Sequence, residues 1–135
     1  MWSIIERFRD DVADIAVVTD AVAGPRLREL TFQPANPDGA PIRLLVGEMS
    51  VVVILGKASL FELGGAETDR RFLRLLLEAA AGGGLREVSD MFGTAYTVRL
   101  SDGSTHRGRV LQFAWRRRST YDYSAWQSSD ARRND

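Results

Sequence analysis

Cysteine is absent from the 135-residue sequence, and histidine and lysine each occur once. Without thiolates the chain can form no disulfide, iron–sulfur cluster or thiolate metal site, and it has no cysteine nucleophile. A single imidazole, that of His106, excludes a site built from several histidines. We therefore expect no catalytic residue, no metal site and no cofactor, and we predict that the chain is not an enzyme.

Long apolar runs are also missing. No stretch approaches the roughly 20 apolar residues that span a bilayer. The first residues, Met1–Arg7, lack the basic and apolar segments of a signal peptide. These features predict a soluble, cytoplasmic protein without a membrane partner. The length is sufficient for one hydrophobic core, so we expect one domain.

A nucleotide-binding loop is not encoded either. The residues Gly56-Lys57-Ala58-Ser59 resemble the end of such a loop. That motif requires a glycine where Val51 stands and a serine or threonine where Ala58 stands. The four residues are instead typical of a turn.

Charge is distributed unevenly along a chain whose formal net charge is zero. Residues 1–106 hold eleven basic and fifteen acidic side chains, whereas residues 107–135 hold seven arginines and three aspartates. The sequence therefore predicts a basic C-terminal segment on a mildly acidic body.

The first 23 residues show helical periodicity. Apolar residues recur every three or four positions from Ile5 to Val22, and the Ser3–Glu6 spacing is that of a capping box. Gly24-Pro25 is a stop signal. The pattern predicts a helix over 4–23, although Ile15–Thr19, rich in β-branched residues, would also suit a strand.

The next forty residues predict strands. Alternating or continuous apolar segments separated by turn residues indicate strands at Leu27–Gln33, Ile42–Val46, Met49–Leu55 and Ala58–Leu63. The cluster Pro34–Pro41 is dense in turn residues and implies a hairpin.

A second helix and a hairpin follow. Thr68 can cap a helix that extends to Ala81, where Gly82-Gly83-Gly84 ends it. Residues 94–101 and 104–116 flank Asp102-Gly103, a strong two-residue hairpin signal.

The hairpin also makes a prediction about the faces of its strands. Pairing across the turn would place Arg107 and Arg109 on the same face as Tyr96 and Val98. A bulge at Gly108 would then direct the apolar residues beyond it, Leu111, Phe113 and Trp115, to the core.

Together these elements predict an α+β fold. We expect an antiparallel sheet of about five to six strands with two helices packed on it, in the order α-β-β-β-β-α-β-β. The domain would occupy residues 1–118, and the polar residues 119–135 would form a loose tail.

The segment from Arg107 onward is the strongest candidate for a functional surface. Arginine offers forked donors to carboxylate or phosphate, and tyrosine and tryptophan are common interface anchors. The candidate partner-binding residues are Arg107, Arg109, Trp115, Arg116, Arg117, Arg118, Tyr121, Tyr123 and Trp126.

Three other interpretations of this segment remain open. The arginines could bind nucleic acid, which a neutral net charge makes the less favoured reading. The aromatic residues could pack against a second copy of the chain. Alternatively, Phe113 and Trp115 could belong to the core while the arginines keep a sheet edge soluble.

An enzyme that uses carboxylates and arginines is the alternative function. Asp10 and Asp14 share one face of the predicted first helix, and Glu48 and Arg99 are further candidates. A solvated helix face is the simpler explanation for the two aspartates, because arginines lie beside them and no histidine does.

The predicted arrangement resembles that of small immunity proteins from bacterial polymorphic and contact-dependent toxin systems. The features in common are the capped N-terminal helix, the antiparallel sheet, the helix at Thr68–Ala81 and the closing hairpin at Asp102-Gly103. The resemblance implies specific binding to one cognate toxin domain through a charged face, with charge complementarity accelerating association. We therefore predict a non-enzymatic protein-binding domain with a protein partner.

Overall fold

The computed structural model describes residues 1–127, which form two helices and nine strands. The helices are α1 (Trp2–Asp11) and α2 (Glu67–Ala81). The strands are β1 (Ala16–Gly24), β2 (Leu27–Pro34), β3 (Ile42–Val46), β4 (Val51–Leu55), β5 (Ser59–Leu63), β6 (Leu85–Asp90), β7 (Gly93–Arg99), β8 (Thr105–Leu111) and β9 (Ser119–Asp122).

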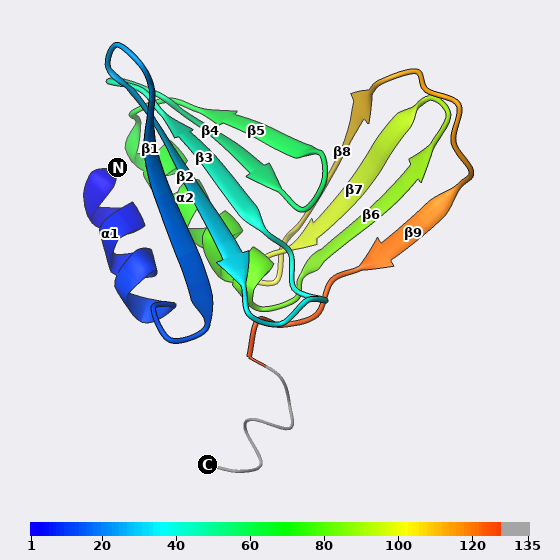
Figure 1. The fold of residues 1–135 in the computed structure, drawn as a ribbon, viewed down its shortest axis with the longest axis horizontal. Helices are drawn as coiled ribbons and strands as arrows, with labels where there is room; N and C mark the ends of the chain where they lie inside the picture. The colour runs from blue at the N-terminus through cyan, green and yellow to red at the C-terminus, as the bar shows by residue number, and fades with distance from the viewer. Residues whose placement is uncertain (128–135) are drawn as a thin grey trace.

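The strands form two antiparallel sheets that lie side by side (Figure 1). The larger sheet is a five-stranded meander in the order β1-β2-β3-β4-β5. The smaller sheet has the order β8-β7-β6-β9, so its last strand returns to pair with its first. Both helices cover the same face of the larger sheet (Figure 1).

The core fills the space between the larger sheet and the two helices. Alternate residues of the central strands point inward, as the register of β2, β3 and β4 requires. Ile5, Phe32, Leu44, Val53 and Leu76 are all fully buried there. The sheet thus presents one apolar face to the helices, whose own apolar stripes complete the core.

The predicted fold class is confirmed, and the number of strands is corrected. The chain is α+β, with antiparallel strands and two helices. It has two sheets in place of one, and β6 and β9 were not predicted as strands. Glu87 and Ser89 are buried residues of β6, so its inward face looks polar in the sequence.

The first helix was predicted too long. It ends at Asp11, and the alternative for the following residues is correct, because Ala16–Gly24 forms β1 and pairs with β2. Apolar residues spaced for a helix here also suit a strand, and pairing with a neighbouring strand decides between the two. The predicted capping box does not form, since the N-cap is Met1 without a side-chain hydrogen bond.

The predicted loose tail is wrong for residues 119–126. Ser119–Asp122 pairs with β6, and Trp126 is only 2% exposed. The indole Nε1 donates a hydrogen bond of 2.9 Å to the carbonyl of Ala40, and the ring packs edge-on against Phe8 at 5.7 Å. The remaining tail residues, 128–135, lie outside the described part of the chain.

The hairpin at Asp102-Gly103 is confirmed, but its register differs from the prediction by one residue. Val98 pairs with His106 and Tyr96 with Gly108, so Arg107 and Arg109 lie on the opposite face. Gly108 forms no bulge. A side chain there would clash with the ring of Tyr96 that lies across it.

Candidate interaction surface

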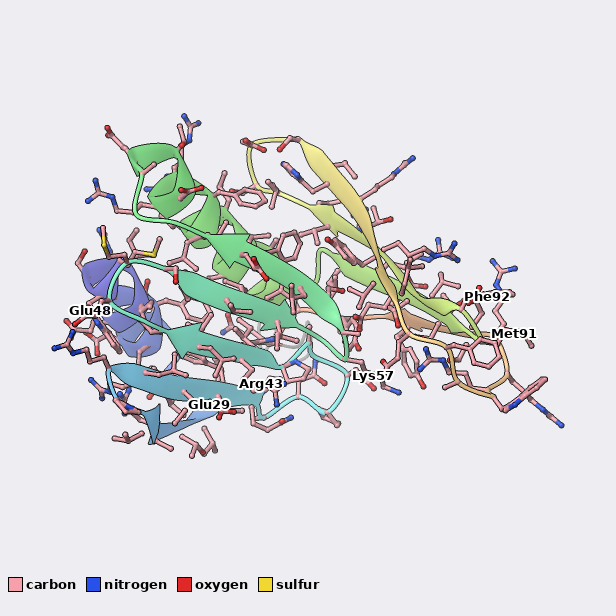
Figure 2. All side chains as sticks on the ribbon, turned by 90° about the horizontal axis from the view of Figure 1, so that it is seen from above. Glu29, Arg43, Glu48, Lys57, Met91 and Phe92 are labelled. Carbon is pink, nitrogen blue, oxygen red and sulfur yellow. The ribbon has the colours of Figure 1, made fainter. Side chains whose placement is uncertain are left out.

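The turn between β6 and β7 carries apolar residues where turns usually carry polar ones. Asp90 pairs with Gly93, which leaves Met91 and Phe92 as the two turn residues. The backbone N–H of Phe92 donates to the Asp90 carboxylate at 2.9 Å and fixes the turn. Met91 and Phe92 lie at the end of the smaller sheet farthest from the helices (Figure 2).

The segment 112–118, between β8 and β9, runs beside this turn. Its backbone donates two hydrogen bonds of 3.0 Å, from Gln112 to the carbonyl of Phe92 and from Ala114 to that of Met91. The turn and the segment therefore form one unit at the end of the smaller sheet.

Four large apolar side chains are exposed on this unit and on the last residue of β8, with exposed fractions between 58% and 84%. They are Phe92, Leu111, Phe113 and Trp115, which we call the aromatic tip. Phe113 lies 6.3 Å from Phe92 and 5.9 Å from Trp115, measured between ring centroids. An apolar patch of this kind on a protein surface usually marks a contact with another molecule.

Arginines adjoin the aromatic tip. Arg116 donates to the carbonyls of Asp90 and Gln112, at 2.5 and 3.0 Å, and so holds the segment against the turn. Arg109 reaches the Asp90 carboxylate at 3.5 Å. Arg117 and Arg118 are exposed, and within residues 1–127 neither forms an ion pair. Exposed aromatic rings and arginines without ion-pair partners among residues 1–127 therefore lie next to each other on this surface.

The predicted partner-binding residues separate into three groups. Trp115 and Arg116–Arg118 lie at the tip, and Arg109 contacts it through Asp90. Arg107 lies farther along the outer face of β8. Tyr121 and Tyr123 lie on the other face of the smaller sheet, and Trp126 is in the core, where it cannot meet a partner.

Phe92, Leu111 and Phe113 belong to the surface but were not among the predicted residues. Leu111, Phe113 and Trp115 were all expected to reach the core, and all three are exposed. Leu111 lies on the same outer face of β8 as Arg107 and Arg109, whereas Phe113 and Trp115 come after the end of β8, where the chain leaves the sheet. A signal for Phe92 existed in the sequence. Asp90 and Gly93 are residues that favour a turn, and the two apolar residues between them, Met91 and Phe92, cannot easily be buried at a turn.

Glu87 is the most buried ionisable residue of the smaller sheet, and its contacts indicate a structural role. The carboxylate accepts from the backbone N–H groups of Lys57 and Ala58, at 2.8 and 3.0 Å. It also accepts from the hydroxyls of Ser59 and Tyr123, at 2.7 and 2.6 Å. Four donors saturate this carboxylate, which thereby fastens the β4–β5 turn of one sheet to β6 of the other.

Two tyrosines beside this carboxylate differ in acidity. Burial, and then hydrogen bonding to Glu87, raises the pKa of Tyr123 far above its usual value. The Lys57 ammonium, with a further contribution from Ser119, lowers the pKa of Tyr121. Lys57 lies over the Tyr121 ring, 3.7 Å from its centroid, at the junction of the two sheets (Figure 2).

We expect this arrangement to make stability depend on alkaline pH. A raised folded-state pKa stabilises the protein below the unfolded value of about 10, and the contribution is lost as pH rises through the folded value. The loss of unfolding free energy in Tyr123→Phe, measured by urea denaturation, should therefore be constant below pH 10 and shrink above it. A loss that grew with pH above 10 would contradict the assignment.

The residues considered for an enzyme are not brought together. The hollow beside Glu48 contains neither Asp10 nor Asp14, and the hollow that Arg99 lines contains none of these three acidic residues. Glu48 instead forms an exposed ion pair with Arg26 at 3.3 Å.

Among residues 1–127, no group of three or more acidic or histidine side chains is placed to hold a metal ion. Over the same residues, neither helix has the length and apolar character needed to cross a membrane.

Comparison with protein-family models, with curated proteins and with solved structures finds no match to this chain.

Proposed function

We propose that this chain is a non-enzymatic protein-binding domain whose partner contacts the aromatic tip. The observation that carries the proposal is the group of four large apolar side chains held exposed by backbone hydrogen bonds at one end of the smaller sheet. Keeping such side chains in water is unfavourable, so their exposure is best explained by a contact that covers them.

The composition of the tip favours a protein as the partner. Tryptophan and arginine are enriched among the residues that contribute most to protein–protein affinity. The backbone hydrogen bonds that join Gln112 and Ala114 to the turn also limit the conformational entropy lost on binding. We expect the partner to present an apolar pocket for Trp115 or Phe113, bordered by carboxylates that pair with Arg117 and Arg118.

The finer form of the proposal is that the chain is an immunity protein. A positively charged tip suits capture of an acidic toxin domain, because complementary charges accelerate association. Neutralisation would then follow from covering the active site of the toxin. A toxin domain encoded by a neighbouring gene is the first partner to test.

The proposal is tested by site-specific photo-crosslinking in the native cell. We expect a crosslinker placed at Trp115 to capture one protein species, whereas one placed at Val22, an equally exposed apolar position on β1, captures none of it. With the captured partner in hand, Trp115→Ala and Phe113→Ala should each weaken binding by about 30-fold or more. Val22→Ala should leave the affinity unchanged.

Several outcomes would contradict the proposal. If both Trp115→Ala and Phe113→Ala left the affinity for the partner unchanged, the partner would bind at a different surface. Sedimentation of the chain with anionic vesicles, abolished by Trp115→Ala, would show that the tip binds membrane. A dimer in size-exclusion chromatography that Trp115→Ala converts to monomer would show self-association.

A further inference from the structure

The outer face of the smaller sheet contains a hollow lined by three arginines. Arg86 of β6 and Arg107 of β8 lie on either side of Thr97 of β7 in one cross-strand row. Arg99 follows Thr97 on the same face of β7. The three arginines and Thr97 line a hollow of about 440 Å³.

The charge of this hollow is only partly neutralised by the described residues. Asp122 of β9, which also lines it, pairs with Arg86 at 3.4 Å. Neither Arg99 nor Arg107 forms an ion pair within residues 1–127. Three guanidinium groups against one carboxylate leave about two positive charges facing the hollow, which suits a ligand with two or more negative charges.

The geometry indicates which anion fits. The arginines come from three strands, with Arg86 and Arg107 on either side of β7 and Arg99 on β7 itself. Each guanidinium can donate two parallel hydrogen bonds. A carboxylate has only two oxygens to share among them, whereas a phosphoryl group has three terminal oxygens pointing in different directions. The volume lies within the range of small-molecule sites, and strands hold the lining residues in place.

We propose that this hollow binds a small phosphorylated molecule, such as a phosphate monoester or a diphosphate, through Arg86, Arg99 and Arg107. The site is separate from the aromatic tip. The register that places Arg107 on the outer face creates it, because the predicted register would have pointed Arg107 toward the other face. Because the two sites use different residues, binding of an anion in the hollow can be tested separately from binding of a protein at the aromatic tip.

Calorimetric titration of the full chain with pyrophosphate, at low and constant ionic strength, tests the proposal. We expect one site per chain. Arg99→Gln and Arg107→Gln should each weaken binding at least about tenfold, since a charge-assisted hydrogen bond is lost. Arg117→Gln and Arg118→Gln remove the same charge at the tip and should leave binding unchanged, whereas Asp122→Asn should strengthen it.

Each alternative has its own result. Absence of pyrophosphate binding, or equal weakening by the tip variants, would overturn the proposal. Succinate that bound as tightly as pyrophosphate would show a carboxylate site. Single-stranded DNA that bound more tightly than pyrophosphate and depended on the same arginines would show a nucleic-acid surface. Circular dichroism of each variant checks that these exposed substitutions leave the fold intact.

Discussion

A chain that ends at Arg118 is expected not to fold. The truncation removes β9 from the edge of the smaller sheet, the Tyr123 hydroxyl from Glu87 and the Trp126 indole from the core. Loss of a buried tryptophan alone costs about 3–5 kcal/mol. A domain of this size is stable by only about 5–15 kcal/mol, so the combined loss is comparable with the whole free energy of folding. Far-ultraviolet circular dichroism will show whether the truncated chain has secondary structure, and urea denaturation will show whether it unfolds cooperatively.

A chain that ends at Gln127 is the control, because it keeps every contact described above. It should unfold cooperatively. If the chain ending at Arg118 unfolded equally cooperatively, the placement of β9 and Trp126 would be wrong.

Two tryptophans separate the contribution of burial from that of chain length. Trp126→Ala should lower the unfolding free energy by about 3–5 kcal/mol, whereas Trp115→Ala, at an 84% exposed position, should change it by less than about 0.5 kcal/mol. Trp126→Phe keeps much of the packing against Phe8 but loses the hydrogen bond to Ala40, so its cost should be intermediate. Equal effects of the two alanine substitutions would contradict the difference in burial between Trp126 and Trp115 in the structure.

The parts of the fold that the sequence predicts well depend on local signals. Helix α2 ends at Ala81 because three glycines follow it, and the β7–β8 hairpin turns at Asp102-Gly103. In both cases the residues that determine the backbone are adjacent in the sequence. The class of fold follows from such elements, since short connections between strands favour antiparallel pairing.

The parts that the sequence predicts poorly depend on partners far along the chain. Glu87 looks like a solvent-facing residue until the β4–β5 turn, about thirty residues earlier, supplies it with donors. Trp126 looks like part of a polar tail until Ala40, Ala81 and Phe8 surround it. Periodicity cannot reveal such contacts, because each involves a polar or isolated residue whose partner is distant.

The candidate surface shows the same division. Composition alone indicates that residues 107–118 are rich in arginine and aromatic side chains, and Trp115 with Arg116–Arg118 does lie on one exposed surface. The position of Arg107 on the outer face could not be predicted, because it depends on a pairing register that a shift of one residue reverses. That single residue of register decides whether the outer face of the smaller sheet carries the arginine-lined hollow.

Replacing Glu87 with alanine should be among the most destabilising substitutions outside the apolar core. It leaves the N–H groups of Lys57 and Ala58 and two hydroxyls, those of Ser59 and Tyr123, without their acceptor. An unsatisfied buried donor costs about 1–3 kcal/mol. Allowing for water that enters the space, we expect a loss of about 4 kcal/mol in the unfolding free energy measured in urea.

Glu87→Gln and Glu62→Gln form a matched pair. The first keeps the shape of the side chain but turns one acceptor into a donor that faces other donors, so it should cost roughly half as much as Glu87→Ala. The second makes the same change on the exposed outer face of β5 and should fall within about 0.5 kcal/mol of the unmodified chain. A similar cost for both glutamine variants would contradict the proposed role of Glu87.

Gly56 offers an independent test of the same contact. Its backbone has a φ of 64°, and an added Cβ would clash with the Glu87 carboxylate. Gly56→Ala should therefore be strongly destabilising in the unmodified chain. In the Glu87→Ala background the closest of these clashes is gone. The tight contacts with the side chains of Leu85 and Tyr123, both at 2.9 Å, remain, as does the left-handed backbone conformation, which costs about 1–2 kcal/mol. The double-mutant cycle should thus show a large coupling energy, and additive effects would place Glu87 away from this turn.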